Sequence, residues 1–142
     1  MKSTYILGSI AVVTAFIATG FAVSSYAQKP FDEQAFRTAF TQADQNGDGY
    51  INVDEYVAYF VGAFHTFDKN GDHYLVEAEL PNSEPARFRS ADRNGDGKLS
   101  VGEAVAFKMI DYFDIDTNHD GVLSIDEILV FERARAKATG GQ

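Results

Sequence analysis

Residues Asp92 to Glu103 read DRNGDGKLSVGE, with oxygen-bearing side chains at the first, third, fifth, ninth and twelfth places. A hard cation such as Ca²⁺ takes about six to eight oxygen ligands. A short loop can wrap these oxygens around one point only if its backbone turns sharply. Gly97, at the sixth place, permits that turn because it has no Cβ. The spacing therefore predicts a calcium-binding loop, and a plain polar turn between two helices would not require it.

The same pattern occurs three more times. Its other copies read DQNGDGYINVDE, DKNGDHYLVEAE and DTNHDGVLSIDE, and the first aspartates of successive copies lie 24 residues apart. A fixed period indicates one supersecondary unit used four times. In chain order the copies are loop 1 (Asp44–Glu55), loop 2 (Asp68–Glu79), loop 3 (Asp92–Glu103) and loop 4 (Asp116–Glu127).

Apolar residues repeat with the loops. An aromatic side chain stands four residues before each first aspartate, and Ile or Leu fills every eighth place. Apolar residues at helical spacing on both sides of a loop predict two helices that bury one face each. The expected core residues are Phe40, Phe64, Phe88 and Tyr112 before the loops, and Ile51, Leu75, Leu99 and Leu123 within them.

Four such loops resemble the EF-hand superfamily, as in calmodulin-like proteins, from Phe31 to about Lys137. The resemblance implies an all-α fold, an EF-hand array of four helix–loop–helix calcium loops in one compact domain over residues 28–137. It also implies up to four Ca²⁺ ions, with Mg²⁺ as a competitor that suits a bidentate Glu less well. In that family the first, third and fifth side chains bind the ion, with the seventh carbonyl, the ninth place and a bidentate twelfth Glu.

Carried over to this chain, the implied ligands follow loop by loop, the seventh residue contributing its backbone carbonyl. They are Asp44, Asn46, Asp48, Tyr50, Asn52 and Glu55 in loop 1; Asp68, Asn70, Asp72, Tyr74 and Glu79 in loop 2; Asp92, Asn94, Asp96, Lys98, Ser100 and Glu103 in loop 3; and Asp116, Asn118, Asp120, Val122, Ser124 and Glu127 in loop 4.

Loop 2 departs from the pattern at two places. His73 replaces the sixth-place glycine, and Val76 brings no side-chain oxygen to the ninth place. A non-glycine residue held at positive φ costs on the order of 1–3 kcal/mol. We therefore expect loop 2 to bind calcium most weakly.

The connections between loops are short. Only twelve residues separate each closing Glu from the next first Asp. Tyr56–Phe67 and Ala104–Ile115 contain no proline, so each is predicted to form one helix shared by two loops. In the middle connection Pro81 is expected to stop the helix that leaves loop 2, and Ser83 to cap a new helix with Pro85 in its first turn.

Shared helices restrict which loops can pair. A helix of about fifteen residues is roughly 22 Å long, so the two loops at its ends cannot lie side by side. The break at Pro81 allows loop 2 to pair with loop 3. If the two long helices run antiparallel, loop 1 meets loop 4. This pairing predicts backbone contacts between Leu75 and Leu99 and between Ile51 and Leu123.

The N-terminal segment has the form of a secretory signal. Lys2 precedes an uncharged run over residues 5–23, and small residues stand at Ser25 and Ala27. This predicts a signal peptide over residues 1–27 and a periplasmic or secreted protein. An uncleaved membrane anchor over residues 5–23 is the alternative, and it alone would bring contact with a membrane.

At the other end of the chain, residues 138–142 are expected to be a disordered tail.

Composition narrows the function. With 21 acidic and 12 basic residues the formal net charge is −9, which argues against nucleic acid as a partner. The chain contains no cysteine, and no nucleophile constellation is visible, so we do not expect an enzyme.

We expect a calcium buffer or sensor. The alternative is a module that Ca²⁺ folds so that it docks a protein partner. After removal of residues 1–27 only Met109 would remain, which does not favour a methionine-rich groove.

Overall fold

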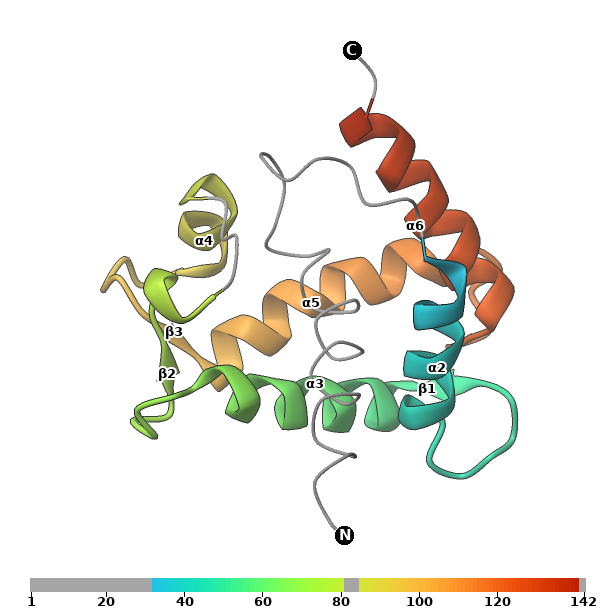
Figure 1. Ribbon diagram of the computed structural model, residues 1–142, viewed down its shortest axis with the longest axis horizontal. Helices are drawn as coiled ribbons and strands as arrows, with labels where there is room; N and C mark the ends of the chain where they lie inside the picture. The colour runs from blue at the N-terminus through green and yellow to red at the C-terminus, as the bar shows by residue number, and fades with distance from the viewer. Residues whose placement is uncertain (1–31, 81–84, 141–142) are drawn as a thin grey trace, which may run out of the picture.

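The computed structural model describes residues 32–80 and 85–140, and most of these are helical (Figure 1). The helices are α2 (Glu33–Ala43), α3 (Val53–Phe67), α4 (Pro85–Ala91), α5 (Val101–Ile115) and α6 (Ile125–Gly140), with a 3₁₀ turn at Glu77–Glu79. The strands are β1 (Ile51–Asn52), β2 (Tyr74–Leu75), β3 (Leu99–Ser100) and β4 (Val122–Leu123). The expected helical character is confirmed, and two small antiparallel sheets are added to it.

Helices α3 and α5 are each one uninterrupted element of 15 residues, as the spacing predicts. Each begins at a capping box, in which the side chain of Asn52 or Ser100 accepts a hydrogen bond from the third helical residue, a glutamate. Each ends at the first aspartate of the next loop, Asp68 or Asp116, which serves as the C-cap. One helix therefore leaves one loop and enters the next.

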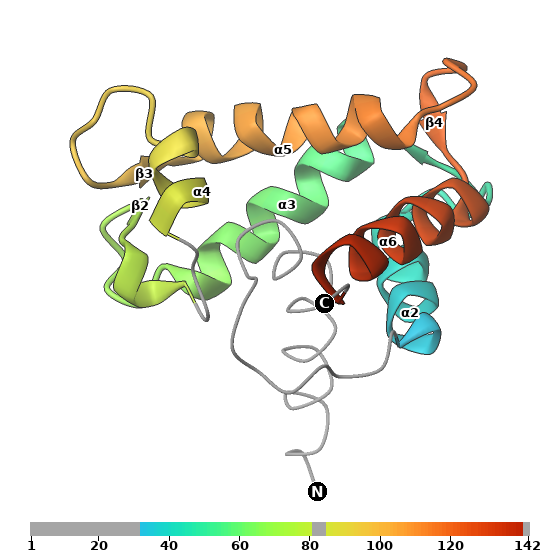
Figure 2. The same cartoon turned by 90° about the horizontal axis from the view of Figure 1, so that it is seen from above.

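The predicted loop pairing is confirmed. Strand β1 pairs with β4, which places Ile51 opposite Leu123, and β2 pairs with β3, which places Leu75 opposite Leu99. Helices α3 and α5 run in opposite directions and cross between the two pairs of loops (Figures 1 and 2). Loops 1 and 4 consequently meet at one end of the long helices, and loops 2 and 3 meet at the other.

The middle connection is interrupted, as expected. After loop 2 the described residues up to Leu80 form only the short turn Glu77–Glu79, and α4 begins at Pro85. Leu80 closes this turn and is buried. The predicted cap at Ser83 lies outside the described residues, as does the predicted signal peptide or anchor within residues 1–31. Among the residues that are described, no helix has both the length and the hydrophobicity needed to span a bilayer.

The buried side chains of the described residues form two clusters. One lies at the end of loops 2 and 3 and comprises Phe60, Ala63, Phe64, Phe67, Leu75, Leu80, Phe88, Ala91, Leu99 and Ala104. The other lies at the end of loops 1 and 4 and comprises Phe36, Phe40, Ala43, Ile51, Tyr56, Tyr112, Ile115, Leu123, Ile128 and Leu129. The length of α3 and α5 explains the division, because each loop pair packs against a different end of these helices.

Helix α6 packs against α2 and α5 and carries charges that join them. Arg133 on α6 donates to Glu33 on α2. On α5, Lys108 is 3% exposed and forms an ion pair of 2.5 Å with Asp111. Arg135 of α6 also lies 3.7 Å from the Asp111 carboxylate. Burial lowers the pKa of Lys108, and the neighbouring Asp111 carboxylate opposes that effect.

The extent of α6 differs from the expectation for the C-terminus. The helix continues to Gly140, three residues into the stretch 138–142 for which we predicted disorder. Residues 138 and 139 are Ala and Thr, and neither forces a helix to stop. The last two residues lie outside the described part of the chain.

Candidate metal centres

The first aspartate of each loop organises the backbone around it. In loop 3, Asp92 Oδ1 accepts hydrogen bonds from the amides of Gly95 at 2.7 Å and Asp96 at 3.2 Å, and Oδ2 accepts from the amide of Gly97 at 2.9 Å. Loops 1 and 2 repeat all three bonds around Asp44 and Asp68. The loop backbone thus converges on one carboxylate.

The third and fifth side chains also accept hydrogen bonds from loop amides. Asn94 Oδ1 accepts from the amide of Asp96 at 2.8 Å, and Asp96 Oδ1 accepts from the amide of Lys98 at 2.9 Å. Asn94 also donates from Nδ2 to Asp96 Oδ2 at 3.1 Å. The two bonds from backbone amides recur in the other three loops through Asn46, Asp48, Tyr50, Asn70, Asp72, Tyr74, Asn118, Asp120 and Val122. The bond from the amide side chain recurs in loops 1 and 4.

The twelfth-place glutamate reaches back across the loop. Glu103 Oε2 accepts from the amide of Ser100 at 3.0 Å and from its hydroxyl at 2.7 Å, while Oε1 accepts from the amide of Asn94 at 3.3 Å. These bonds from Ser100 hold the pKa of the Glu103 carboxyl below its ordinary value. Burial raises the pKa of Glu127, but hydrogen bonds from Ser124 and Asn118 outweigh this, so the pKa is lowered. Both carboxylates are therefore held in the ionised form that a cation requires.

The ninth-place residues have a role that the sequence analysis missed. Asn52 and Ser100 cap the helices that follow loops 1 and 3, and Ser124 accepts a hydrogen bond from the amide of Glu127 in the same way. The signal for this role is present in the sequence as a polar residue followed three places later by Glu, which is the capping-box pattern. Val76 cannot make this bond, and the helix after loop 2 is reduced to a 3₁₀ turn.

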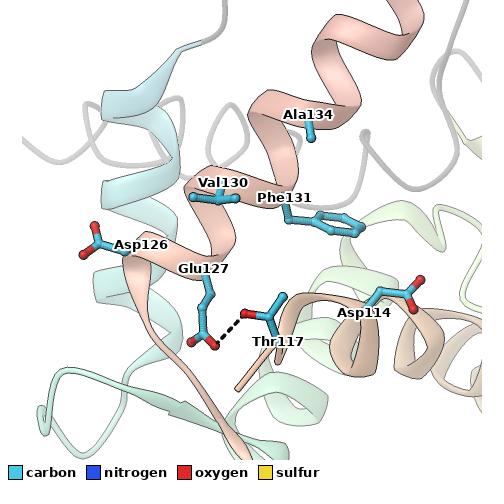
Figure 3. Close-up of a pocket in the computed structure, with 7 residues that line it drawn as sticks. All are labelled: Asp114, Thr117, Asp126, Glu127, Val130, Phe131 and Ala134. Carbon is cyan, nitrogen blue, oxygen red and sulfur yellow. Dashed lines mark hydrogen bonds between the residues drawn. The ribbon is translucent and has the colours of Figure 1, made fainter. Parts of the chain in front are cut away.

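Loop 4 is braced from two sides. Tyr112, 1% exposed, donates its hydroxyl to the carbonyl of Gly121 at 2.7 Å. Thr117 donates to Glu127 Oε1 at 3.5 Å (Figure 3). Beside this bond lies a mainly apolar pocket of about 380 Å³, lined by Asp114, Thr117, Asp126, Glu127, Val130, Phe131 and Ala134.

Two loops contain a non-glycine residue in the left-handed region. His73, at the sixth place of loop 2, has φ of 67°, which confirms the positive φ expected there. His119, at the fourth place of loop 4, has φ of 59°. The fourth place is glycine in the other loops, each with positive φ, so the sequence carried this second signal as well. Both histidines are of a type that tolerates this conformation better than most.

The structure therefore gathers each predicted set within its own loop. The first, third, fifth and twelfth side chains are joined through the loop backbone, and their coordination of an ion stays a prediction. The donors are carboxylate, amide and carbonyl oxygens, which suit Ca²⁺ better than a soft metal. A carboxylate oxygen has two acceptor sites, and Asp92 Oδ2 accepts one of these hydrogen bonds, so it keeps a site for a cation. Glu103 accepts two hydrogen bonds at each oxygen, so a bidentate ion would have to displace some of them.

Comparison with known proteins agrees with this geometry. The family model described as EF hand matches residues 36–61, 86–103 and 114–131, which contain loops 1, 3 and 4. No curated protein matches the chain. The three matches support placement in the EF-hand superfamily and indicate calcium binding in general. Loop 2 lies outside the matched segments, and it is the loop with His73 and Val76.

Relief of backbone strain is expected to tighten loops 2 and 4. His73→Gly and His119→Gly should each raise the calcium affinity of the altered loop about tenfold, since about 1.4 kcal/mol is a factor of ten and the strain is of that order. Calorimetric titration would measure the change. Gln45→Gly is the matched control, because it adds glycine at a loop position without positive φ. Unchanged affinity in both histidine variants would contradict the explanation by strain.

The pairing of loops predicts coupled calcium binding. Glu103→Gln removes a ligand charge from loop 3 and should weaken loop 2 as well, through the β2–β3 contact, while loops 1 and 4 keep their affinity. An NMR titration can follow each loop through its sixth-place amide, which donates to the first aspartate, at Gly49, His73, Gly97 and Gly121. Glu77→Gln makes the same charge change at an exposed residue of loop 2 outside the ligand places. An undisturbed loop 2 in Glu103→Gln would show that the pair does not transmit binding.

Proposed function

We propose that the chain is an exported, non-enzymatic calcium-binding protein that acts as a buffer, taking up to four Ca²⁺ through its four loops, with loop 2 weakest. The all-oxygen ligand sets and the EF-hand matches support calcium binding. Mg²⁺ would compete, although its smaller octahedron suits the twelfth-place glutamates less well.

The shared helices favour a buffer over a sensor. In sensor EF-hands calcium changes the angle between the helix that enters a loop and the helix that leaves it. Here α3 leaves loop 1 and enters loop 2, so its rotation at one end must be accommodated at the other. Its aromatic residues are buried at both ends, with Tyr56 in one cluster and Phe64 in the other. Close-packed cores resist such movement. Calcium is therefore expected to tighten the fold without opening a groove.

Exposed apolar side chains favour a second candidate, a calcium-folded module that docks a protein. Ile110 and Phe113 on α5 are 52% and 63% exposed, and Val130 on α6 is 65% exposed. Val130 also lines the pocket beside Glu127 (Figure 3). Exposed apolar side chains of this size are typical of interaction surfaces when they are contiguous. Calcium at loop 4 would fix the segment that carries this pocket.

Calcium titration with a hydrophobic dye present separates the two roles. We expect up to four binding events, little added dye fluorescence and a higher melting temperature, because each site at 100 times its dissociation constant adds about 2.7 kcal/mol to the free energy of unfolding. Chelation should leave a loose, early-melting protein, since the loop carboxylates then repel one another. A melting temperature that chelation leaves unchanged would refute the proposal. A calcium-dependent rise in dye fluorescence would favour the docking module.

Export is proposed from the N-terminal segment and has its own test. The protein recovered from outside the cytoplasm should begin at Gln28, as shown by intact mass and N-terminal sequencing. Ala27→Pro is expected to block that cleavage, since small residues are required before the cut. An intact N-terminus on a protein that fractionates with membranes would support the anchor over residues 5–23, and an intact cytoplasmic protein would exclude export.

A further inference from the structure

A cluster of different chemistry lies at the entrance to loop 2. Donor atoms of His65, Asp68 and His73 all lie within 4.8 Å of one another. The imidazole rings of the two histidines have centroids 6.2 Å apart and stand nearly perpendicular, at 88°. Both histidines are exposed. Two imidazoles and one carboxylate thus converge on one accessible point.

The fold brings these residues together for local reasons. His65 stands in the last turn of α3, three residues before Asp68, which is the C-cap of that helix. Residues three apart on a helix lie on the same face. The positive φ of His73 turns the loop back, and its amide donates to Asp68 Oδ2 at 2.9 Å. The strained residue that weakens the loop for calcium is therefore the one that brings a second imidazole to Asp68.

This donor set suits a different ion from the calcium loops. Imidazole nitrogen is a ligand of Zn²⁺, Cu²⁺ and Ni²⁺, whereas Ca²⁺ takes oxygen ligands. Zn²⁺ is often held by three protein ligands and a water molecule, with Zn–N distances of about 2.0–2.1 Å. Ligand atoms around such an ion lie about 3.4 Å apart, so the two exposed rings need to move only slightly from their present separation.

We propose that His65, Asp68 and His73 form a binding site for a divalent transition-metal ion of the Zn²⁺ or Cu²⁺ class. The two imidazoles and the Asp68 carboxylate bind the ion, and water completes its coordination. This site is separate in chemistry from the four oxygen-lined loops, but it shares one side chain with loop 2.

The shared side chain makes the two ions antagonists. Asp68 is the first calcium ligand predicted in loop 2, and two dications held by one carboxylate repel at short range. Transition-metal binding should therefore lower the calcium affinity of loop 2, and calcium should lower the transition-metal affinity by the same factor, as linkage requires. This antagonism rests on the proposed calcium function, whereas the binding of the transition metal does not.

Zn²⁺ titration of the full chain, followed by NMR of the imidazole carbon–hydrogen signals, tests the site. The chain has three histidines, so His119 is an internal control. One equivalent of Zn²⁺ should shift the signals of His65 and His73 and leave those of His119 in place. Equal shifts in all three rings, or no shift, would overturn the proposal.

Variants sharpen the result. His65→Gln should lower the Zn²⁺ affinity at least tenfold, because it removes a direct ligand. Loss of a residue that only hydrogen-bonds a metal ligand already lowers metal affinity about 10–100-fold. His119→Gln is the matched control and should bind Zn²⁺ as the unaltered chain does. His73→Gly should lose Zn²⁺ affinity while it gains calcium affinity. Wild-type Zn²⁺ binding by His65→Gln would contradict the site.

A calcium competition separates this proposal from the one on which it partly rests. Saturating Ca²⁺ should lower the Zn²⁺ affinity of the unaltered chain at least tenfold. Zn²⁺ binding at His65 and His73 that calcium does not affect would overturn the antagonism at Asp68. Failure of every loop to bind calcium, with Zn²⁺ still bound, would refute the calcium function and leave the site intact.

Discussion

Only twelve residues separate successive loops, and this short spacing governs how the helices and loops are arranged. It leaves room for one helix where two would otherwise stand, so α3 and α5 each serve two loops. Two loops at opposite ends of one rigid helix cannot contact each other. Each loop therefore pairs with a loop that does not share its long helix. The β1–β4 and β2–β3 contacts, the opposed directions of the long helices and the two separate hydrophobic clusters all follow from this length.

Within each loop the same groups hold the fold and form the candidate site. The first aspartate ends one helix and receives the loop amides, and the closing glutamate of loops 1, 3 and 4 completes the cap of the next helix. These hydrogen bonds orient the carboxylates before any ion arrives, but they also gather negative charge in a small volume. A cation relieves that repulsion, so binding and folding are expected to be linked in this chain.

The four loops are not equivalent, and their differences lie in the backbone. Loop 3 carries glycine at both places that need positive φ, whereas loop 2 and loop 4 each carry a histidine at one of them. In loop 2 that histidine faces another at the end of α3, so departure from the calcium pattern coincides with ligands for a different class of metal. Loop 4 keeps a serine at the ninth place, Ser124, where loop 2 has Val76. Loop 4 is also held by the Tyr112 hydroxyl, and the equivalent residue before loop 2 is Phe64, which has no hydroxyl.

The loop boundaries, the shared helices and the pairing of the loops follow from the sequence alone, because glycine, proline and the 24-residue period report local constraints and lengths. The sequence also contains patterns from which the capping role of Ser100 and the positive φ of His119 could have been predicted. Three features are visible in the fold alone: the two hydrophobic clusters, the extent of α6 to Gly140 and the proximity of His65 to His73. These features depend on how the helices pack and on the φ of His73. The spacing of residues along the chain does not give the distance between His65 and His73, because the turn at His73 sets that distance.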